Sequence, residues 1–229
     1  MVLAAPPEQM ADFLSFLKSD ERFADMTFKE SISDNQPFNR MLVRLKKEII
    51  AFDMLFDPAK DGGKYVDPKT LKKWLDGEQE VVLLDTRNDY EVEMGSFEKA
   101  LKPPMKSFKE FKQVVDDLDP SLKDKTIVTF CTGGVRCEKA APYMEQQGFK
   151  DVYQIDGGIL QYFKECGGDH WDGECFVFDQ RVSVDPKLVQ TDKKLCYRCR
   201  HPLTAQDQQS PDYVVDVSCP HCVSQRAVG

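Results

Sequence analysis

A cysteine, two glycines and an arginine lie within six residues of one another, between a run of β-branched residues and a helical segment. The run Thr126–Phe130 is typical of a strand, and Glu138 to Gln147 of a helix. A strand, a short glycine loop and a helix N-terminus together direct several backbone N–H groups at an anion. A thiol at that place ionises more readily than a free thiol. We therefore predict that Cys131 is a reactive nucleophile. The alternative is a buried structural cysteine before a turn.

The length of the loop narrows its chemistry. Arg136 follows Cys131 by five positions, which gives the pattern C-x4-R, whereas cysteine phosphatases use C-x5-R to surround a phosphate. A ring one residue smaller suits a single sulfur atom or a similarly compact adduct. Arg136 either holds the thiolate electrostatically or is a surface residue in the first helical turn. The predicted active-site loop after the cysteine consists of Thr132, Gly133, Gly134, Val135 and Arg136.

Three further residues are expected to support this site. The buried strand Glu80–Asp85 ends in an acid, and Arg87 follows two positions later. Because the carboxyl ends of parallel strands meet at one edge of a sheet, we expect Asp85 and Arg87 near the loop as a charge-assisted pair. The alternative is a strand-end acid and a solvated base. Cys137 is either a resolving thiol for an oxidised Cys131 or a small buried helix residue.

The C-terminal region carries a second cysteine pattern, C-x2-C-x19-C-x2-C, which is typical of a tetrahedral zinc site. Because a segment with so small an apolar core gains folding energy from a metal, we predict structural zinc. The alternatives are a redox pair or two disulfides. We expect Cys166 and Cys175 to be inert packing residues, and no histidine is placed as a base for Cys131. The predicted ligands are Cys196, Cys199, Cys219 and Cys222.

Composition limits the classes of function. The 229 residues have a net charge of −8, and the pI is near 5.0. This charge argues against general, field-driven binding of nucleic acid but leaves room for a local basic patch and a specific RNA substrate. The sequence contains neither a stretch of about 20 apolar residues nor a signal peptide. We predict a cytoplasmic protein without a membrane segment, with its eight cysteines reduced.

Strands and helices alternate between about Tyr65 and Gly168, which predicts an α/β domain with a doubly wound parallel sheet. An α+β unit precedes it, with a helix over 7–18 and strands over 25–32 and 41–50. The segment 169–190 reads as a hairpin connector.

The motifs resemble a known family. Asp85-Thr86-Arg87, Glu91, Gly95 and the loop 131–136 resemble a rhodanese domain. The longer segments 85–91, 130–139 and 175–182 are similar to the TrhO group, the rhodanese-domain tRNA uridine hydroxylases. This resemblance implies oxygen-dependent formation of 5-hydroxyuridine at the wobble position, with the anticodon region of tRNA as partner and molecular oxygen as co-substrate. It also implies a ferredoxin-like N-terminal domain, inside which this chain is expected to begin.

These inferences define an ordered set of domains and three functional hypotheses. Besides the hydroxylase, the loop suits a sulfurtransferase that carries a persulfide on Cys131 and meets a sulfur donor. The third hypothesis is a non-catalytic redox or interaction module. The sequence does not indicate the oligomeric state. The predicted domains are a partial ferredoxin-like unit over 1–56, a linker over 57–64, a rhodanese domain over 65–168, the connector over 169–190 and a zinc-binding segment over 191–229.

Overall fold

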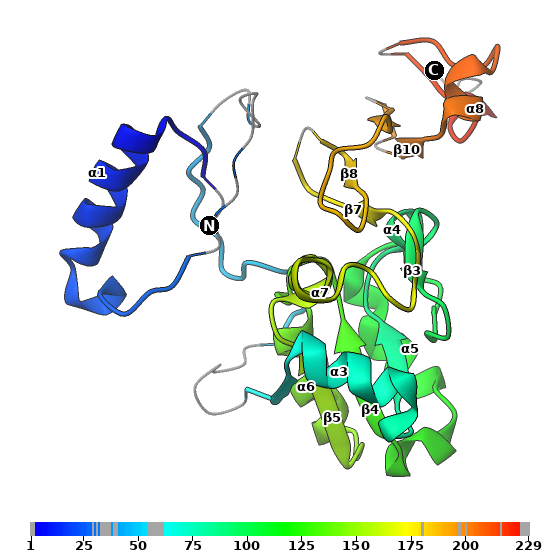
Figure 1. Cartoon of the computed structure of the whole chain (residues 1–229). Coiled ribbons are helices and arrows are strands. Elements are labelled where there is room, and N and C mark those ends of the chain that lie inside the picture. The colour runs from blue at the N-terminus through cyan, green and yellow to red at the C-terminus, as the bar shows by residue number, and fades with distance from the viewer. Residues whose placement is uncertain are drawn as a thin grey trace. The chain divides into compact units, whose positions relative to one another are not determined.

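The computed structural model describes residues 3–28, 30, 32, 38, 41–54, 62–179, 181–196, 198, 199, 201–215 and 217–224, with Glu78 lacking a described side chain. The chain forms two compact units, Met1–Leu45 and Lys46–Gly229 (Figure 1). Within the described parts of the chain, no helix combines the length and hydrophobicity that crossing a bilayer requires.

A parallel sheet forms the centre of the second unit. Its strand order is β1-β5-β4-β2, with β4 paired to both β5 and β2. Beyond β2, a parallel bridge between Leu84 and Leu101 extends the sheet by one residue. The bounds of the strands are β1 (Lys64–Val66), β2 (Val82–Asp85), β4 (Thr126–Phe130) and β5 (Asp151–Ile155).

The side chains of successive strand residues lie on opposite faces of the sheet. They therefore pack in two separate apolar layers. Leu83 and Val128 pack in one layer with α3 (Pro68–Lys73) and α7 (Gly158–Cys166). Their strand neighbours Leu84 and Ile127 pack in the other with α5 (Phe111–Asp117) and α6 (Cys137–Gln146). Helices therefore cover both faces of a parallel sheet, which confirms the predicted doubly wound α/β fold.

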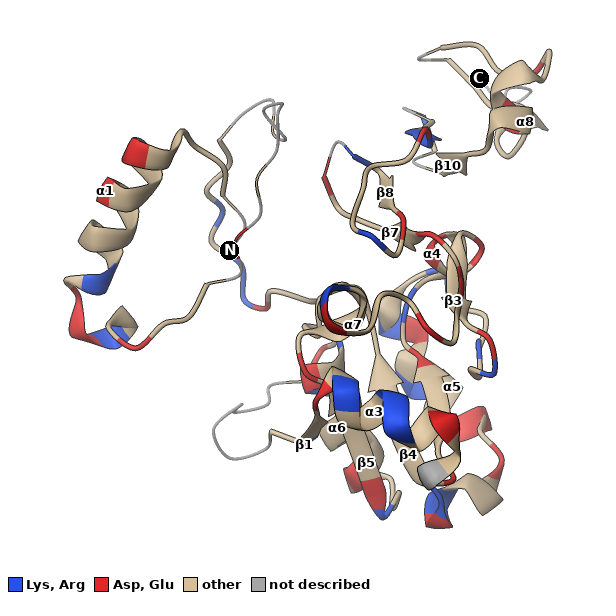
Figure 2. Ribbon diagram, in the orientation of Figure 1, with Lys and Arg blue, Asp and Glu red and all other residues tan. Residues whose placement is uncertain are grey.

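Local signals explain where α3 begins and ends. The Asp67 side chain accepts a hydrogen bond from the Thr70 amide at 3.0 Å, and Pro68 occupies the first helical position. The helix continues into one π-helical turn, η2 (Trp74–Glu78), in which Gly77 has a φ of 109°. Figure 2 shows basic residues on the solvent side of α3, where Lys72 pairs with Asp76 at 2.7 Å. The helix thus begins at an Asp-Pro signal and ends at a glycine.

Short elements complete the second unit. β3 pairs with β6 in an antiparallel ladder, β7 with β8, and β9 with β10. The β7–β8 pair is the hairpin expected within the connector. The remaining bounds are α4 (Asp89–Val92), β3 (Gly95–Phe97), η3 (Phe108–Glu110), η4 (Pro120–Asp124), β6 (Trp171–Gly173), β7 (Cys175–Phe176), β8 (Ser183–Val184), β9 (Lys194–Leu195), β10 (Pro202–Leu203) and α8 (Ala205–Gln209).

The first unit contains α1 (Pro7–Lys18), as expected, followed by the 3-10 turn η1 (Glu21–Phe23). The strand predicted over 41–50 is wrong, because these residues form no ladder and Met41, Val43 and Leu45 are exposed. A strand is stabilised by cross-strand pairs, and the described residues of this unit supply no partner. The described part of 25–32 is likewise not a strand, while residues 29 and 31 lie outside the described residues.

Residues 46–54 belong to the second unit and pack against α5 and α6. The Phe52 ring is buried, with its centroid 5.1 Å from Phe108 and 5.4 Å from Tyr143. The Lys139 ammonium group pairs with Glu48 and donates to the Ile50 carbonyl oxygen at 2.8 Å. Residues 46–54, which we call the strap, therefore form part of the apolar layer that contains α5 and α6. Most of the predicted linker, 57–64, lies outside the described residues, and its last residue begins β1.

We expect Phe52→Ala to lower the free energy of unfolding by about 3–5 kcal/mol, because it leaves a cavity beneath the strap. Phe16→Ala is the matched control, since Phe16 is 74% exposed on α1 and its loss changes stability by only about 0.5 kcal/mol. Guanidinium unfolding followed by circular dichroism measures both. Equal effects of the two substitutions would contradict the described packing of Phe52.

Candidate active site and metal centre

Cys131 directly follows β4, at the carboxyl end of the parallel sheet, and its side chain is buried. Two hydrogen bonds fasten its loop to the first turn of α7. The Ile159 amide donates to the Cys131 carbonyl oxygen at 3.0 Å, and the Leu160 amide to that of Thr132 at 3.1 Å. Gly158 has a φ of +68°, and a Cβ atom there would lie 2.5 Å from the Cys131 carbonyl oxygen. Only glycine allows this approach, so the Asp-Gly-Gly turn before α7 shapes the loop.

The surroundings of Cys131 favour a thiolate. A hydrogen bond from the Cys137 thiol, the positive charge of Arg136 and the backbone amides of residues 136 and 137 outweigh burial and lower the pKa of Cys131 to about 5, from an ordinary 9.0. Burial and the facing Cys131 sulfur raise the pKa of Cys137 well above 9.0. The two sulfurs therefore differ in protonation at neutral pH. Cys131 carries the negative charge, and the Cys137 thiol keeps its proton and donates it in the hydrogen bond to Cys131.

Arg136 is buried and pairs with Glu91 through two parallel bonds. Its Nη1 donates to Glu91 Oε1 at 2.6 Å and its Nη2 to Oε2 at 2.7 Å. The guanidinium carbon lies 5.7 Å from the centroid of the Phe178 ring. Burial alone would lower the pKa of Arg136, but Glu91 and Cys131 outweigh it and raise that pKa above its ordinary value. Arg136 is therefore a fixed cation beside the thiolate, and not a surface residue of the helix.

Glu91 is the main residue of this site to which the sequence analysis gave no role of its own. It lies at the third position of α4, where its Oε1 accepts from the Asn88 amide at 3.2 Å in a capping box. The Thr132 hydroxyl approaches its Oε2 at 3.5 Å, and the carboxylate is fully buried. The spacing Asn-x-x-Glu after a strand signals the cap in the sequence. Its pairing with Arg136, 45 residues away, carries no local signal.

Asp85 and Arg87 come together as a fully buried ion pair. Arg87 Nη2 donates to Asp85 Oδ2 at 2.7 Å and to the Gly95 carbonyl oxygen at 2.6 Å, and the Ser96 hydroxyl donates to the same carboxylate oxygen at 2.7 Å. The guanidinium carbon lies 5.2 Å from the centroid of the Trp171 ring. The pair thus holds β3 and β6 against the end of β2. Neither residue makes a described hydrogen bond to the loop 131–136.

The other cysteines and histidines near the sheet take different positions. Cys175 is buried, and burial raises its pKa to about 12, so it stays a neutral thiol. Cys166 lies partly exposed at the end of α7. His170 pairs with Asp76 at 2.7 Å, and the described contacts include none between a histidine and Cys131. Among the described residues, therefore, no histidine is placed to take a proton from Cys131, whose thiol the surroundings already favour in its ionised form.

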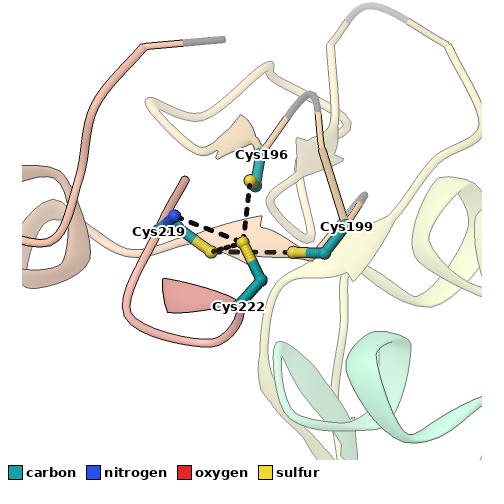
Figure 3. Close-up of side chains that lie close together, drawn as sticks. All are labelled: Cys196, Cys199, Cys219 and Cys222. Carbon is teal, nitrogen blue, oxygen red and sulfur yellow. Dashed lines mark hydrogen bonds between the residues drawn. The ribbon is translucent and has the colours of Figure 1, made fainter. Parts of the chain in front are cut away.

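The four C-terminal cysteines converge on one point (Figure 3). Their sulfurs all lie within 4.8 Å of one another, with Cys196–Cys222 at 3.9 Å, Cys199–Cys219 at 3.6 Å and Cys219–Cys222 at 3.7 Å. A disulfide requires about 2.05 Å, and all eight cysteines are free. Four sulfurs bound tetrahedrally at about 2.3 Å from a metal lie ~3.8 Å apart. The cluster therefore has the donor set and the spacing for a metal ion.

Short elements hold this cluster together. The Cys196 amide donates to the His201 carbonyl oxygen at 2.9 Å, which closes the turn between β9 and β10. The Cys219 amide donates to the Cys222 sulfur at 3.4 Å. Leu203 is the buried apolar residue that packs with the cysteines. So small an apolar core agrees with a segment that a metal stabilises.

A parallel sheet with helices on both faces and a reactive cysteine loop at its carboxyl end defines a rhodanese-like protein. Residues 67–165 match the Rhodanese-like domain family, and residues 1–49 match the UPF0176 acylphosphatase-like domain. A solved rhodanese-like domain protein from Staphylococcus aureus is 29% identical, covers 43% of this chain and 90% of its own, and has a TM-score of 0.37.

Relatives that match nearly the whole chain define a narrower family than the rhodanese-like domain does. The tRNA uridine(34) hydroxylase of Cupriavidus pinatubonensis is 49% identical over 231 residues, which cover 98% of this chain and 82% of that protein. That of Ralstonia nicotianae is 46% identical, with the same two shares covered. The chain belongs to the tRNA uridine(34) hydroxylase family.

We expect alkylation of Cys131 by iodoacetamide to rise with pH through a midpoint near 5, because only the thiolate reacts. Cys137→Ala removes the hydrogen bond that contributes most to the lowered pKa and should move the midpoint upward. Cys166→Ala, which changes a thiol at the far end of α7, should leave it in place. Mass spectrometry of the peptide that contains Cys131 measures the rate. A wild-type midpoint near 9 would contradict the described electrostatics.

Proposed function

We propose that this protein hydroxylates the wobble uridine of tRNA at C5, with Cys131 as its reactive thiolate and molecular oxygen as co-substrate. One oxygen atom replaces the C5 hydrogen as a hydroxyl group, and a two-electron reductant converts the other to water. The observation that carries the proposal is the lowered pKa of Cys131 in a loop at the carboxyl end of the sheet, in a chain whose relatives are named tRNA uridine(34) hydroxylases. A tRNA substrate places the protein in the cytoplasm.

The residues in and around the loop have different roles in this proposal. Cys131 supplies the nucleophilic sulfur, and the thiol of Cys137 and the backbone amides of residues 136 and 137 hold its negative charge. Arg136 adds a positive charge that Glu91 keeps in one orientation. Residues 132–135 complete the short C-x4-R ring, whose length suits a compact adduct on sulfur. Asp85 and Arg87 act at a distance, by fixing the strand ends on which the loop rests.

Sulfur transfer is the second candidate, because the same ring fits a persulfide on Cys131. Such a protein takes one sulfur atom from a donor and passes it to an acceptor thiol, which restores the cysteine. The lowered pKa of Cys131 supports both reactions, since each begins from the thiolate. The lowered pKa argues against a purely structural cysteine, whereas the enzyme names of the relatives support turnover over a redox module, which also needs a thiolate.

The deciding experiment compares the tRNA of a strain that lacks this protein with tRNA of the same strain carrying wild type, Cys131→Ser or Cys166→Ser. We expect wild type and Cys166→Ser to restore the one-oxygen mass increment on wobble uridines, and Cys131→Ser to fail. Mass spectrometry of the nucleosides measures it. If wild type restores nothing in a strain without a second pathway, hydroxylation is excluded. Persulfide on Cys131 and thiosulfate-dependent turnover would then favour sulfur transfer.

We also propose that Cys196, Cys199, Cys219 and Cys222 hold a structural zinc ion. Four thiolates without a position for substrate are typical of a closed zinc site. When bound, the metal supplies cohesion to a segment whose buried apolar residues are few. Its distance in sequence from Cys131 and its closed donor set give it no chemical step.

We expect one zinc per purified chain and its loss in Cys219→Ala, because Cys219 is a buried member of the cluster. Cys175→Ala is the matched control, since Cys175 is equally buried but lies in β7. Plasma mass spectrometry measures the metal, and limited proteolysis should cut the metal-free variant after about residue 190. Full zinc content in Cys219→Ala would exclude the proposed ligand set.

A further inference from the structure

A cavity of about 320 Å³ lies between the rhodanese-like core and the four-cysteine tail. α4 and the β7–β8 hairpin provide one wall, and β9 with the turn after it provides the other. Its volume is at the lower end of the range of about 300–1,000 Å³ that small-molecule sites occupy. The residues that line it are Tyr90, Phe176, Val177, Phe178, Asp179, Leu195, Cys199 and His201.

Aromatic rings dominate the wall on the core side. The centroids of Tyr90 and Phe176 are 5.2 Å apart and those of Phe176 and Phe178 are 5.0 Å apart, both in edge-to-face contact. Phe178 is 65% exposed, although it lies in a part of the chain where other apolar side chains are buried. An exposed ring that contacts with Phe176 and Arg136 hold in place offers a free face for stacking.

This wall continues directly into the active-site loop. The Thr132 hydroxyl donates to the Phe176 carbonyl oxygen at 3.2 Å. Arg136 lies against the Phe178 ring, with its guanidinium carbon 5.7 Å from the centroid. Neither Cys131 nor residues 132–136 line the cavity itself. A ligand in the cavity therefore lies next to the wall that contacts Thr132 and Arg136 of the loop.

The charges around the cavity tolerate a polyanion. The one acid in its lining, Asp179, is paired with Arg181 through bonds of 2.6 and 3.0 Å, which neutralise it. Lys193 and the exposed Lys194 directly precede the lining residue Leu195 in the chain. The cavity thus combines aromatic faces with the guanidinium group of Arg136 at its edge. Single-stranded nucleic acid is recognised by this combination of aromatic rings and cations.

We propose that this cavity binds one unstacked nucleobase of an RNA loop, the base next to the uridine that reacts at Cys131. The inference rests on the proposed function and adds the position of a neighbouring nucleotide. The base stacks on Phe178, while the phosphate that links it to the reacting nucleotide passes towards the loop. Phe178 is a binding residue in this arrangement and takes no part in the chemistry.

The test measures the affinity of the zinc-containing full chain for an anticodon stem-loop RNA by fluorescence anisotropy. We expect Phe178→Ala to weaken binding about tenfold or more, in line with base–aromatic stacking of about 1–3 kcal/mol. Phe178→Trp keeps a ring at the position and should retain at least wild-type affinity. Phe16→Ala removes an equally exposed phenylalanine from the other unit and should have little effect.

The same RNA with an abasic nucleotide on either side of the target uridine completes a double-mutant cycle. At one of the two positions, removal of the base should weaken binding to wild type and leave no further loss for Phe178→Ala. Equal losses with intact and abasic RNA at both positions would overturn the inference, as would unchanged affinity of Phe178→Ala.

The two proposals can fail separately. If wild type hydroxylates wobble uridine and the cycle shows no coupling, the base site is wrong and the proposed function stands. If the cycle shows coupling but no 5-hydroxyuridine forms, the cavity binds RNA bases and the proposed reaction is wrong. A third RNA carries the abasic nucleotide at the target uridine itself. Coupling of Phe178→Ala to that position would place the reacting base in the cavity and overturn the assignment to its neighbour.

Discussion

The buried pair of Arg136 and Glu91 is the interaction on which the site depends. It joins the loop after β4 to α4 after β2, two segments that the sheet brings together only at its carboxyl edge. Removing two charges from water costs several kcal/mol per ion, and good geometry with further hydrogen bonds must offset that cost. Here the two parallel bonds between Arg136 and Glu91 supply the geometry. The backbone amide of Asn88 donates a further hydrogen bond to Glu91. The loop is thus held at both ends, by this pair and by the first turn of α7.

This arrangement also explains the electrostatic character of the site. Because Glu91 takes both terminal nitrogens of Arg136, the arginine offers its charge to the thiolate but few free donors to a bound anion. A phosphate dianion needs more hydrogen-bond donors than the paired arginine has left to offer. A single thiolate needs fewer, because the Cys137 thiol and two backbone amides already stabilise it. The short C-x4-R ring and the engaged arginine therefore agree on small adducts at sulfur.

The sequence predicted those elements whose own residues carry a clear secondary-structure pattern. Thr126–Phe130 reads as a strand because its residues are β-branched and apolar, and the structure forms β4 over those same residues. β1 escaped prediction because two of its three residues are exposed and its pairing with β5 crosses most of the domain. The strand expected over 41–50 shows the reverse error, since alternation without a partner strand does not make a sheet.

The site follows the same division. Cys131, Arg136 and the four clustered cysteines carry spacing that chemistry requires, so the sequence indicates them. Glu91 and Phe178 both contact Arg136, which lies about 45 residues away from each in the sequence. No local sequence pattern predicts such long-range pairing. The roles assigned to Cys131 and its loop rest on chemistry that the structure places together, and they remain predictions until the tRNA comparison is made.

The double anchoring of the loop has a consequence for evolution. Its first two residues are bonded to Ile159 and Leu160, and Arg136 is bonded to Glu91, so only residues 133–135 lie between the anchors. An insertion that enlarges the ring towards the size of a phosphate site must therefore fall within these three residues if it is to keep both anchors. Gly133 is exposed, with open space around it, and is the position in this segment with the most room for such a change.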